Sequence, residues 1–373
     1  MSRTHHPDNE RIKRRYLSYL KETRGFAEPT LDHVATAIDR FQACTRFRDF
    51  KAFHIQQVTG FKRHLAEQLT VRTKERLSHA TVYSTLNALK VFFEWVAGQP
   101  GYKKSFSFGD WQYFSPSGIT ASIAKASRSP RAPTLEQVRH VLQSMPARNE
   151  IERRDRALIA FVIVTGARCT ALTSFKLRHV DIERRHLFQD AREVRTKFRK
   201  TFETWFFPVG DDLEAMVVDW VRFLTEEMLW GLDDPLFPNT RMAIGTTGHF
   251  ERAGLDRNPW SSTGPVRAIF RDAFEAAGLP YAHPHSLRHT LVALGRDRCK
   301  TWAEMQAWAQ NLGHESLTTT FGSYGKVGAH EQGELVRNAG KERVSVATRM
   351  DQLEARVTSM AAQRLQGEAD EHR

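Results

Sequence analysis

Cysteine and long hydrophobic runs are both scarce in this 373-residue chain. Its three cysteines, Cys44, Cys169 and Cys299, lie far apart and form no CxxC pair, which excludes a disulfide framework and is typical of a reducing cytoplasm. The longest apolar run, ALIAFVIV from Ala157 to Val164, is too short to cross a bilayer. The N-terminal stretch has no continuous apolar region of the kind found in signal peptides. We therefore expect a cytoplasmic protein without a membrane partner.

Acidic residues are outnumbered in the sequence. Asp and Glu number 43 against 55 Lys and Arg, which gives a formal net charge of +12. Hydrophobic residues make up 40% of the chain, so a length of 373 residues can supply the cores of two domains. A basic excess favours a polyanionic partner, and nucleic acid is the first candidate. A merely basic protein with no such partner would have the same composition.

The first hundred residues have the apolar spacing of helices. Residues 30–44 place Leu31, Val34 and Ile38 on one face, with Thr30 as the expected N-cap. Residues 59–69 and 78–98 repeat this spacing. The pattern stops after Gly101, where Ser, Pro, Ala and basic residues dominate up to Pro133. We therefore divide the chain into a helical N-terminal domain (1–105), a linker (106–133), a second domain (134–340) and a C-terminal tail (341–373).

The second domain has a mixed pattern. Thr134 is the expected N-cap of its first helix, a buried helix ends at Gly166, and another is expected from Arg168 to about Leu177. Residues 186–210 alternate β-branched or aromatic residues with polar ones, which predicts two or three short antiparallel strands. Helical spacing then returns over 211–229 and 262–280. The expected fold class is mainly α with a small antiparallel β-sheet in the second domain.

The C-terminal tail carries an apolar stripe at alternating spacings of three and four: Val346, Met350, Leu353, Val357 and Met360. The stripe is only about two and a half heptads long, so a helix docked on a neighbouring surface and a short coiled coil are both compatible with it.

The stretch HPHSLRHT, residues 283–290, crowds three histidines and Arg288 at the expected start of a helix. His285 and His289 are four residues apart and could share a zinc ion. No acidic residue lies close by, however, and the Arg288 cation favours an anion over a metal. A guanidinium fork, imidazole donors and the free N–H groups of a helix start together suit a phosphate group.

Two further segments carry similar signals. VTGARC places Arg168 just past a Thr-Gly turn, directly after a buried run. LGHESLTTTFGSYG supplies His314, a Thr run, and Tyr324 among Gly and Ser residues. A tyrosine in such surroundings belongs to a loop and not to a core.

Three segments, TGARCTALTSFKLRHVDI, HPHSLRHT and LGHESLTTTFGSY, occur in this order between about residues 135 and 330. They resemble the three signature boxes of the tyrosine recombinases, the phage integrase family. The preceding region, about 10–105, is similar to the core-binding DNA domain of that family by pattern only. The resemblance implies a two-domain DNA clamp, with a catalytic domain at 134–340 and a tail at 341–373 that contacts other protomers.

The resemblance also implies six catalytic residues: Arg168, Lys197, His285, Arg288, His314 and Tyr324. The lysine of the family sits on a β-hairpin between the first and second boxes. Lys197 is the best match for it, and Lys200 is the runner-up. No cofactor and no metal are implied.

These residue types suit the chemistry of a phosphodiester. Two arginines can neutralise the charge that develops on the phosphorus centre. His285 and His314 can donate to the phosphate or accept the tyrosine proton. Lys197 can protonate the departing 5′ oxygen, while Tyr324 attacks and stores the bond as a 3′-phosphotyrosine. Cationic side chains thus take the place of a metal ion.

The sequence departs from the family at two places. A carboxylate is common three residues after the first arginine, where this chain has Ala171; its loss should affect the positioning of a neighbouring histidine. The step from His314 to Tyr324 is ten residues where the family usually has nine, so the loop between them must absorb one residue.

The resemblance implies double-stranded DNA as partner, four protomers on two DNA sites, and accessory DNA-bending or directionality proteins. The setting would be the bacterial nucleoid, and the reaction would be integration, transposition or resolution. Two other readings stay open: a type IB topoisomerase, and a catalytically idle DNA-binding protein on the same scaffold. The short N-terminal domain and the H-x-x-R-H box favour a recombinase over a topoisomerase, and the intact residue set argues against an idle protein.

Overall fold

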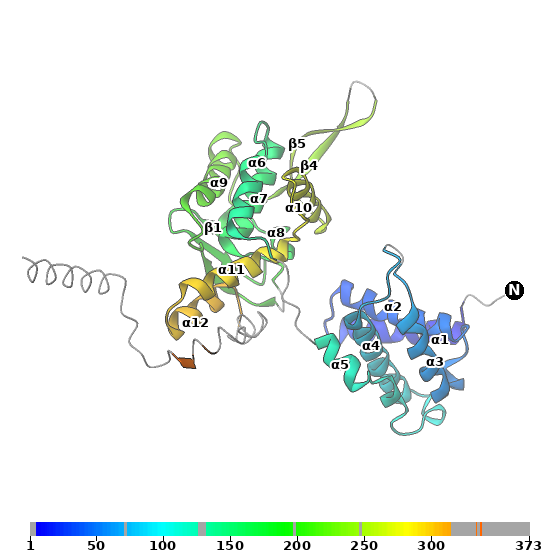
Figure 1. Cartoon of the computed structure of the whole chain (residues 1–373). Helices are drawn as coiled ribbons and strands as arrows, with labels where there is room; N and C mark the ends of the chain where they lie inside the picture. The colour runs from blue at the N-terminus through cyan, green and yellow to red at the C-terminus, as the bar shows by residue number, and fades with distance from the viewer. Residues whose placement is uncertain are drawn as a thin grey trace, which may run out of the picture. The chain divides into compact units, whose positions relative to one another are not determined.

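The chain divides into two compact units, Met1–Arg128 and Ser129–Arg373, each with its own hydrophobic core (Figure 1). The computed structural model describes residues 5–70, 73–125, 132–196, 199–245, 248–314, 333, 336 and 337. We call the first the helical unit and the second the mixed unit. The predicted fold class is confirmed, because helices dominate and the sheets are small and antiparallel. None of the described helices is both long and apolar enough to span a membrane.

The helical unit is built from α-helices joined by 3₁₀ turns: α1 (Pro7–Glu22), α2 (Glu28–Cys44), η1 (Phe50–Ala52), α3 (Ile55–Glu67), α4 (His79–Ala97), η2 (Lys103–Ser105), η3 (Asp110–Phe114) and α5 (Gly118–Lys125). Aromatic rings fill its centre. Phe41 packs edge-on against Phe61 and Phe93, with ring centroids 5.3 and 5.1 Å apart. Helix α2 begins at Glu28 and not after Thr30, because Pro29 lacks an N–H and fits the first helical turn.

The linker prediction needs correction at its N-terminal end. Phe114 of η3 is fully buried in the core of the helical unit and stacks on Phe93 at 5.0 Å. Helix α5 also packs on α4. Residues 106–125 therefore belong to the helical unit. Composition did not predict this, because three aromatic anchors, Phe106, Trp111 and Phe114, are enough to fold a stretch rich in Ser, Gly and Pro.

The mixed unit contains the remaining elements: α6 (Leu135–Ser144), α7 (Glu150–Thr165), α8 (Cys169–Leu172), η4 (Leu177–His179), β1 (Val180–Asp181), β2 (His186–Gln189), β3 (Phe202–Trp205), α9 (Asp211–Arg222), η6 (Phe223–Glu227), β4 (Pro238–Ile244), β5 (Phe250–Pro259), α10 (Gly264–Ala276), α11 (Pro284–Arg298) and α12 (Trp302–Asn311). Strands β1, β2 and β3 form one antiparallel sheet in that order, and β4 pairs with β5 in another.

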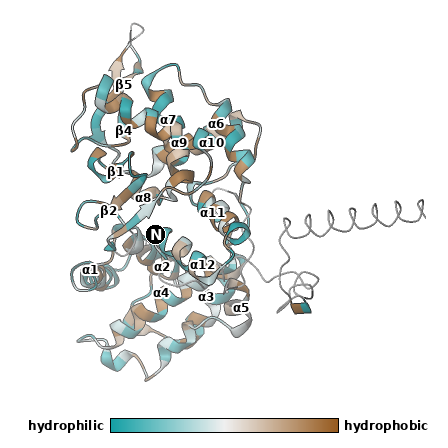
Figure 2. Cartoon of the chain, turned by 90° about the vertical axis from the view of Figure 1, so that its left-hand side faces the viewer, coloured by the Kyte–Doolittle hydropathy of each residue, from teal (hydrophilic) through white to brown (hydrophobic). Residues whose placement is uncertain are grey.

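Helix α7 is the centre of the mixed unit. All its residues from Ala157 to Thr165 are buried, and both α9 and α11 pack against it. Figure 2 shows the apolar colour gathered on α7 and α9. Thr134 caps α6 as predicted, since its hydroxyl accepts from the Gln137 N–H at 3.2 Å. Because α7 is packed on several sides, the position of its C-terminal end is fixed. Arg168 follows directly after that end.

The helix predicted from Arg168 to Leu177 is wrong in length. Helix α8 stops at Leu172. The hydroxyls of Thr173 and Ser174 donate to main-chain carbonyls three residues earlier, at 2.9 and 3.0 Å, in the turn that ends the helix. The chain then turns into η4 and the first sheet.

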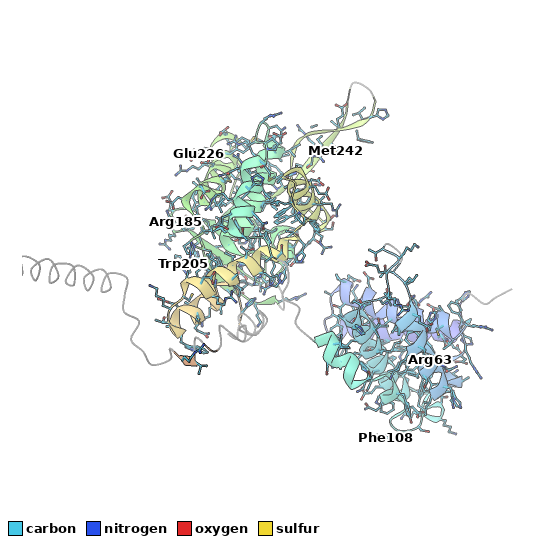
Figure 3. All side chains as sticks on the ribbon, in the orientation of Figure 1. Arg63, Phe108, Arg185, Trp205, Glu226 and Met242 are labelled. Atoms are coloured by element: carbon cyan, nitrogen blue, oxygen red, sulfur yellow. The ribbon has the colours of Figure 1, made fainter. Side chains whose placement is uncertain are left out.

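Strands β4 and β5 form a hairpin that projects from the mixed unit (Figure 1), with Met242 on its outer part (Figure 3). The sequence pattern did not predict these strands. Most of their outer residues are exposed on both faces, so the alternation of apolar and polar residues that marks a half-buried strand is absent.

Candidate active site

Arg288, in the second turn of α11, is the most buried of the predicted site residues that the structure describes, with 3% of its surface exposed. Its guanidinium donates to the carbonyl of Gly166 after α7 and to the carbonyl of Leu312 after α12, the latter at 2.6 Å. The same Nη2 lies 2.9 Å from Nε2 of His314. One side chain thus ties together the ends of two helices. Its Nε has no hydrogen-bond partner among the described residues.

Arg168 enters the same region from the end of α7. Gly166 ends α7 in the left-handed region, with φ of 63°, and Arg168 follows in extended conformation as the N-cap of α8. A Cβ on Gly166 would lie 2.8 Å from Cδ2 of Leu312, so only glycine allows this close approach. Arg168 is half-buried, and its side chain makes no hydrogen bond or ion pair with the residues the structure describes.

The histidines of the second box surround the first turns of α11. The rings of His283 and His285 are nearly parallel, with centroids 6.3 Å apart, and His285 meets His289 edge-on at 5.1 Å. His285 is exposed, yet its pKa is lowered to about 4. The first cause is desolvation by the surrounding protein, and the second is the positive charge of Arg288. His285 is therefore neutral at physiological pH in the absence of a ligand.

His314 is placed by the end of α12. Gly313, with φ of 66°, turns the chain, and the His314 N–H donates to the carbonyl of Ala309 at 3.0 Å. Because Arg288 donates toward Nε2, this nitrogen must be unprotonated, which keeps the imidazole neutral.

The electrostatics of this cluster favour an anion. Burial, with the nearby Arg168 charge as a second cause, lowers the pKa of Arg288 to about 9, and desolvation lowers the pKa of Arg168. Neither arginine forms an ion pair with a carboxylate of the described residues. Two guanidinium groups without a counter-charge are costly to hold together unless an anion binds between them.

A metal ion suits the cluster poorly. His285 and His289 lie close, but the charges of Arg168 and Arg288 act against a cation at this place. Within the described ranges no group of three or more His, Cys, Asp or Glu side chains could hold a metal.

The fold thus brings together Arg168, His285, Arg288 and His314, which are separated by up to 146 residues. Lys197 and Tyr324 lie outside the described residues, as does the apolar stripe of the tail. Lys200 is described and lies two residues before β3, in the segment that joins β2 to β3. Ala171 is buried in the hydrophobic core, so this position supplies no polar group to the cluster.

Sequence reasoning missed the groups that fix Arg288. They are the main-chain carbonyls of Gly166 and Leu312, and main-chain atoms carry no residue signature. The only available signal was the pair of glycines, Gly166 and Gly313, that let the two helix ends approach.

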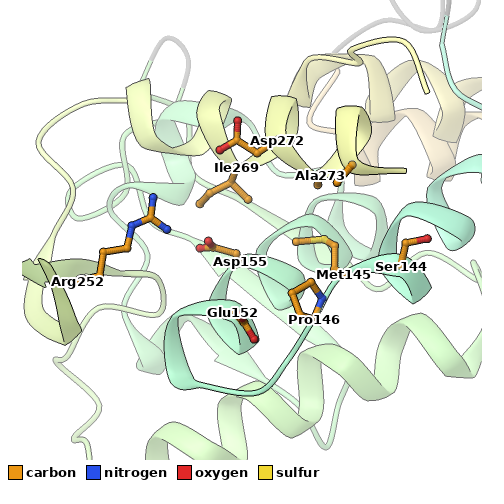
Figure 4. A pocket seen from close by; sticks show the side chains of 10 residues that line it. Ser144, Met145, Pro146, Glu152, Asp155, Arg252, Ile269, Asp272 and Ala273 are labelled. Carbon is orange, nitrogen blue, oxygen red and sulfur yellow. The ribbon is translucent and has the colours of Figure 1, made fainter. Parts of the chain in front are cut away.

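A separate pocket of about 200 Å³ lies between the start of α7, β5 and α10 (Figure 4). Glu152, Asp155 and Asp272 line it together with Arg252. Its three carboxylates would repel a phosphate, and none of the four described site residues, Arg168, His285, Arg288 and His314, lines it.

Comparison with known proteins decides the family. The sequence profile described as the phage integrase family matches residues 133–331, more than half of the chain. The chain belongs to the phage integrase family. It is therefore a tyrosine recombinase, and its activity is site-specific recombination by DNA cleavage and rejoining.

Curated relatives of this integrase-family chain are bacterial. Tyrosine recombinase XerC of Lactobacillus delbrueckii subsp. bulgaricus is 26% identical over 310 residues, which cover 83% of this chain and 92% of XerC. XerC of Bacillus subtilis is 20% identical over 330 residues, which cover 87% and 92%.

Solved structures share the fold of this integrase-family chain. The XerH recombinase bound to palindromic difH substrate in a post-cleavage complex gives a TM-score of 0.58 at 18% identity, covering 87% of this chain and 83% of XerH. A lambda integrase dimer bound to a COC′ core site gives 0.57 at 16% identity, covering 86% and 78%.

Proposed function

We propose that Tyr324 of this recombinase breaks and rejoins double-stranded DNA through a covalent intermediate. The Tyr324 Oη attacks phosphorus, an Oη–P bond forms, and the bond to the 5′ oxygen breaks. The products are a 3′-phosphotyrosine and a free 5′ hydroxyl. A 5′ hydroxyl from a second duplex then attacks the phosphotyrosine, which restores a phosphodiester and releases Tyr324.

The observation that carries this proposal is that two neighbouring arginines, Arg168 and Arg288, have no carboxylate partner among the described residues. Arg288 is buried with a free Nε, and Arg168 lies beside it without a counter-ion among the described residues. A scissile phosphate between them would receive both guanidinium groups. Donors fixed in advance stabilise the extra charge of the five-coordinate transition state more than the charge of the starting diester.

The histidines are assigned to proton and hydrogen-bond work at the same phosphate. His314 has its Nε2 facing Arg288, and this nitrogen can accept the proton that Tyr324 releases once the Arg288 guanidinium turns to the bound phosphate. His285 is neutral at physiological pH, and a bound phosphate would raise its pKa because the anion offsets the nearby positive charges.

The leaving group requires an acid. The departing 5′ alkoxide is strongly basic, so it needs a proton as the P–O bond breaks. We assign this proton to Lys197, with Lys200 as the alternative. Both lie in the segment between β2 and β3, which begins and ends at the paired residues Gln189 and Phe202.

DNA binding is assigned to both units. Residues 1–128 contain 21 Lys and Arg against 11 Asp and Glu, whereas residues 129–373 contain 34 against 32. Most of the net positive charge thus lies in the helical unit. The helical unit would supply non-specific attraction to the phosphate backbone, and the mixed unit would supply the chemistry, so that the two form a clamp around the duplex.

Strand exchange between two duplexes needs several protomers. We propose four, joined through the apolar stripe of residues 341–373 docked on a neighbouring mixed unit. Lambda integrase, with TM-scores of 0.57 and 0.55 to this chain, has been solved as a dimer on a core site and as a tetramer on a Holliday junction. The setting we propose is the bacterial nucleoid, with accessory DNA-bending or directionality proteins as further partners.

The test is covalent capture. Purified protein is mixed with randomised duplexes that carry one nick, so that a short fragment with the new 5′ hydroxyl diffuses away after cleavage. Wild-type protein should give a band shifted on a denaturing gel, and sequencing the captured DNA should yield a consensus site. Excess EDTA should not reduce the yield.

Tyr324→Phe should give no shifted band. The matched control is Tyr281→Phe, because Tyr281 is the other tyrosine of residues 129–373 and is 44% exposed. Adduct from Tyr324→Phe, or its loss from Tyr281→Phe alone, would reject Tyr324 as the nucleophile.

A further inference from the structure

Asn311, the last residue of α12, is joined to strand β3 by two hydrogen bonds. Its Nδ2 donates to the carbonyl of Trp205 at 2.8 Å, and its Oδ1 accepts from the Trp205 N–H at 2.6 Å. A residue on a neighbouring antiparallel strand exchanges the same two bonds with its partner. The Asn311 side chain therefore takes the place of a missing strand at the end of β3. Figure 3 labels Trp205 at this edge of the mixed unit.

A buried chain of hydrogen bonds extends this contact across the sheet. The Thr204 hydroxyl donates to the Asn311 carbonyl at 3.1 Å and accepts from Nε2 of Gln189 at 3.0 Å. Thr204 is fully buried, and Gln189 is 3% exposed. Strands β2 and β3 are thus both connected to the end of α12.

Gly313, in the turn that follows α12, lies close to Phe202 at the other end of β3. Gly313 has φ of 66°, and a Cβ there would lie 2.7 Å from the Phe202 ring. Phe202 is the first residue of β3 and pairs with Gln189. Residues 311–313 therefore bond to β3 at its Trp205 end and lie close to it at its Phe202 end, directly before His314.

We propose that Asn311 is a positioning residue for proton delivery to the leaving 5′ oxygen. The segment that joins β2 to β3 carries Lys197 and Lys200. By fixing the base of that segment against the residues before His314, Asn311 sets the distance from the lysine to the phosphate that Arg288 and His314 hold. The inference rests on the proposed function, and Asn311 itself touches no reacting atom.

The experiment changes the leaving group by one atom. Single-turnover cleavage is measured on two versions of the captured duplex, one with the ordinary 5′ oxygen and one with sulfur at that bridging position. A thiolate leaves without a proton, so the sulfur duplex bypasses the general acid but still requires Tyr324, the arginines and the histidines. The ratio of the two rates isolates proton delivery.

Asn311→Ala should cleave the oxygen duplex about 10-fold more slowly or worse, because general-acid catalysis contributes about 100-fold or more and depends on position. It should cleave the sulfur duplex within about twofold of wild type. Asn311→Asp keeps the acceptor for the Trp205 N–H and loses the donor, and should show the same selective defect. Gln310→Ala, exposed in the same turn, is the control and should match wild type on both duplexes.

Equal slowing on both duplexes would overturn the inference, because Asn311 would then support the phosphate-binding residues or the fold in general. Normal rates on both would overturn it as well. Lys197→Ala and Lys200→Ala are measured in parallel. If sulfur rescues one of them but not Asn311→Ala, only this inference fails. If sulfur rescues neither lysine variant, the proposed general acid fails and this inference falls with it.

Discussion

At the scale of single residues, Arg288 has a role that its charge alone cannot fill. Its guanidinium reaches two carbonyls and Nε2 of His314 at once, which the single nitrogen of a lysine cannot do. Arg288→Lys should therefore slow adduct formation about 100-fold while keeping DNA affinity close to wild type. Arg296→Lys, exposed on the same helix, is the control. A lysine variant with wild-type cleavage would show that charge without geometry suffices.

The lowered pKa of His285 predicts an acid-sensitive fold. In the folded chain the pKa is about 4 against an ordinary value of 6.5, so the unfolded chain binds more protons between these pH values. The free energy of unfolding should therefore fall as the pH is lowered from about 6.5 toward 4. The effect of this one residue is small because His285 is exposed. Denaturant unfolding at pH 7 and pH 5 measures it, and His285→Gln should lose less stability than wild type. An equal loss would reject this assignment.

The sequence pointed to the side chains of the cluster but not to the residues and main-chain groups that hold them in place. Arg168, His285, Arg288 and His314 stand in three short segments that resemble the signature boxes of the family, and the fold brings these four side chains together. Asn311 was invisible because its partners are main-chain atoms of a strand more than 100 residues away. Lys197 and Tyr324 stay predictions from the sequence.

At the scale of elements, the end of α7 controls the site. Gly166→Ala places a Cβ against Leu312 and also strains a left-handed residue, so it should displace the carbonyl that holds Arg288. Gly278→Ala is the matched control, since Gly278 has φ of 70° after α10 but nothing within 4 Å of a Cβ. The left-handed strain should cost both variants about 1–2 kcal/mol of folding stability. Gly166→Ala should lose more than Gly278→Ala, because its Cβ also meets Leu312, and denaturant unfolding measures the difference.

Only Gly166→Ala should also slow adduct formation, in the nicked-duplex assay. Equal activity in the two glycine variants would show that the position of the C-terminal end of α7 does not affect DNA cleavage.

Elements with a strong apolar period and a clear cap, such as α6 behind Thr134, were predictable because both signals are local. Three others were not. Helix α8 is cut short after Leu172, the β4–β5 hairpin has few buried positions, and residues 106–125 fold through a few aromatic anchors. Each of these depends on contacts that a local pattern does not contain.

At the scale of the whole molecule, charge and chemistry are divided between the two units. The helical unit holds an excess of ten positive charges, as counted above, so residues 1–128 alone should bind duplex DNA with a steep salt dependence. The logarithm of affinity should fall by about 0.9 per phosphate neutralised for each unit of log salt. Residues 129–373 alone should show a shallower slope, and the full chain should bind more tightly than either part. Fluorescence anisotropy over a salt series measures all three. Full affinity in residues 129–373 alone would contradict the clamp.

The central claim is a phosphotyrosine at Tyr324, and peptide mapping of the trapped adduct tests it most directly. Trypsin should release residues 301–326 as one peptide, because no Lys or Arg occurs from Thr301 to Gly325. Tyr324 is the one tyrosine in that peptide. After nuclease treatment, mass spectrometry should find the peptide heavier by a 3′-linked nucleotide, with fragmentation placing the added mass on Tyr324. The same mass on the peptide that contains Tyr281, or an adduct with no modified tyrosine, would contradict the account.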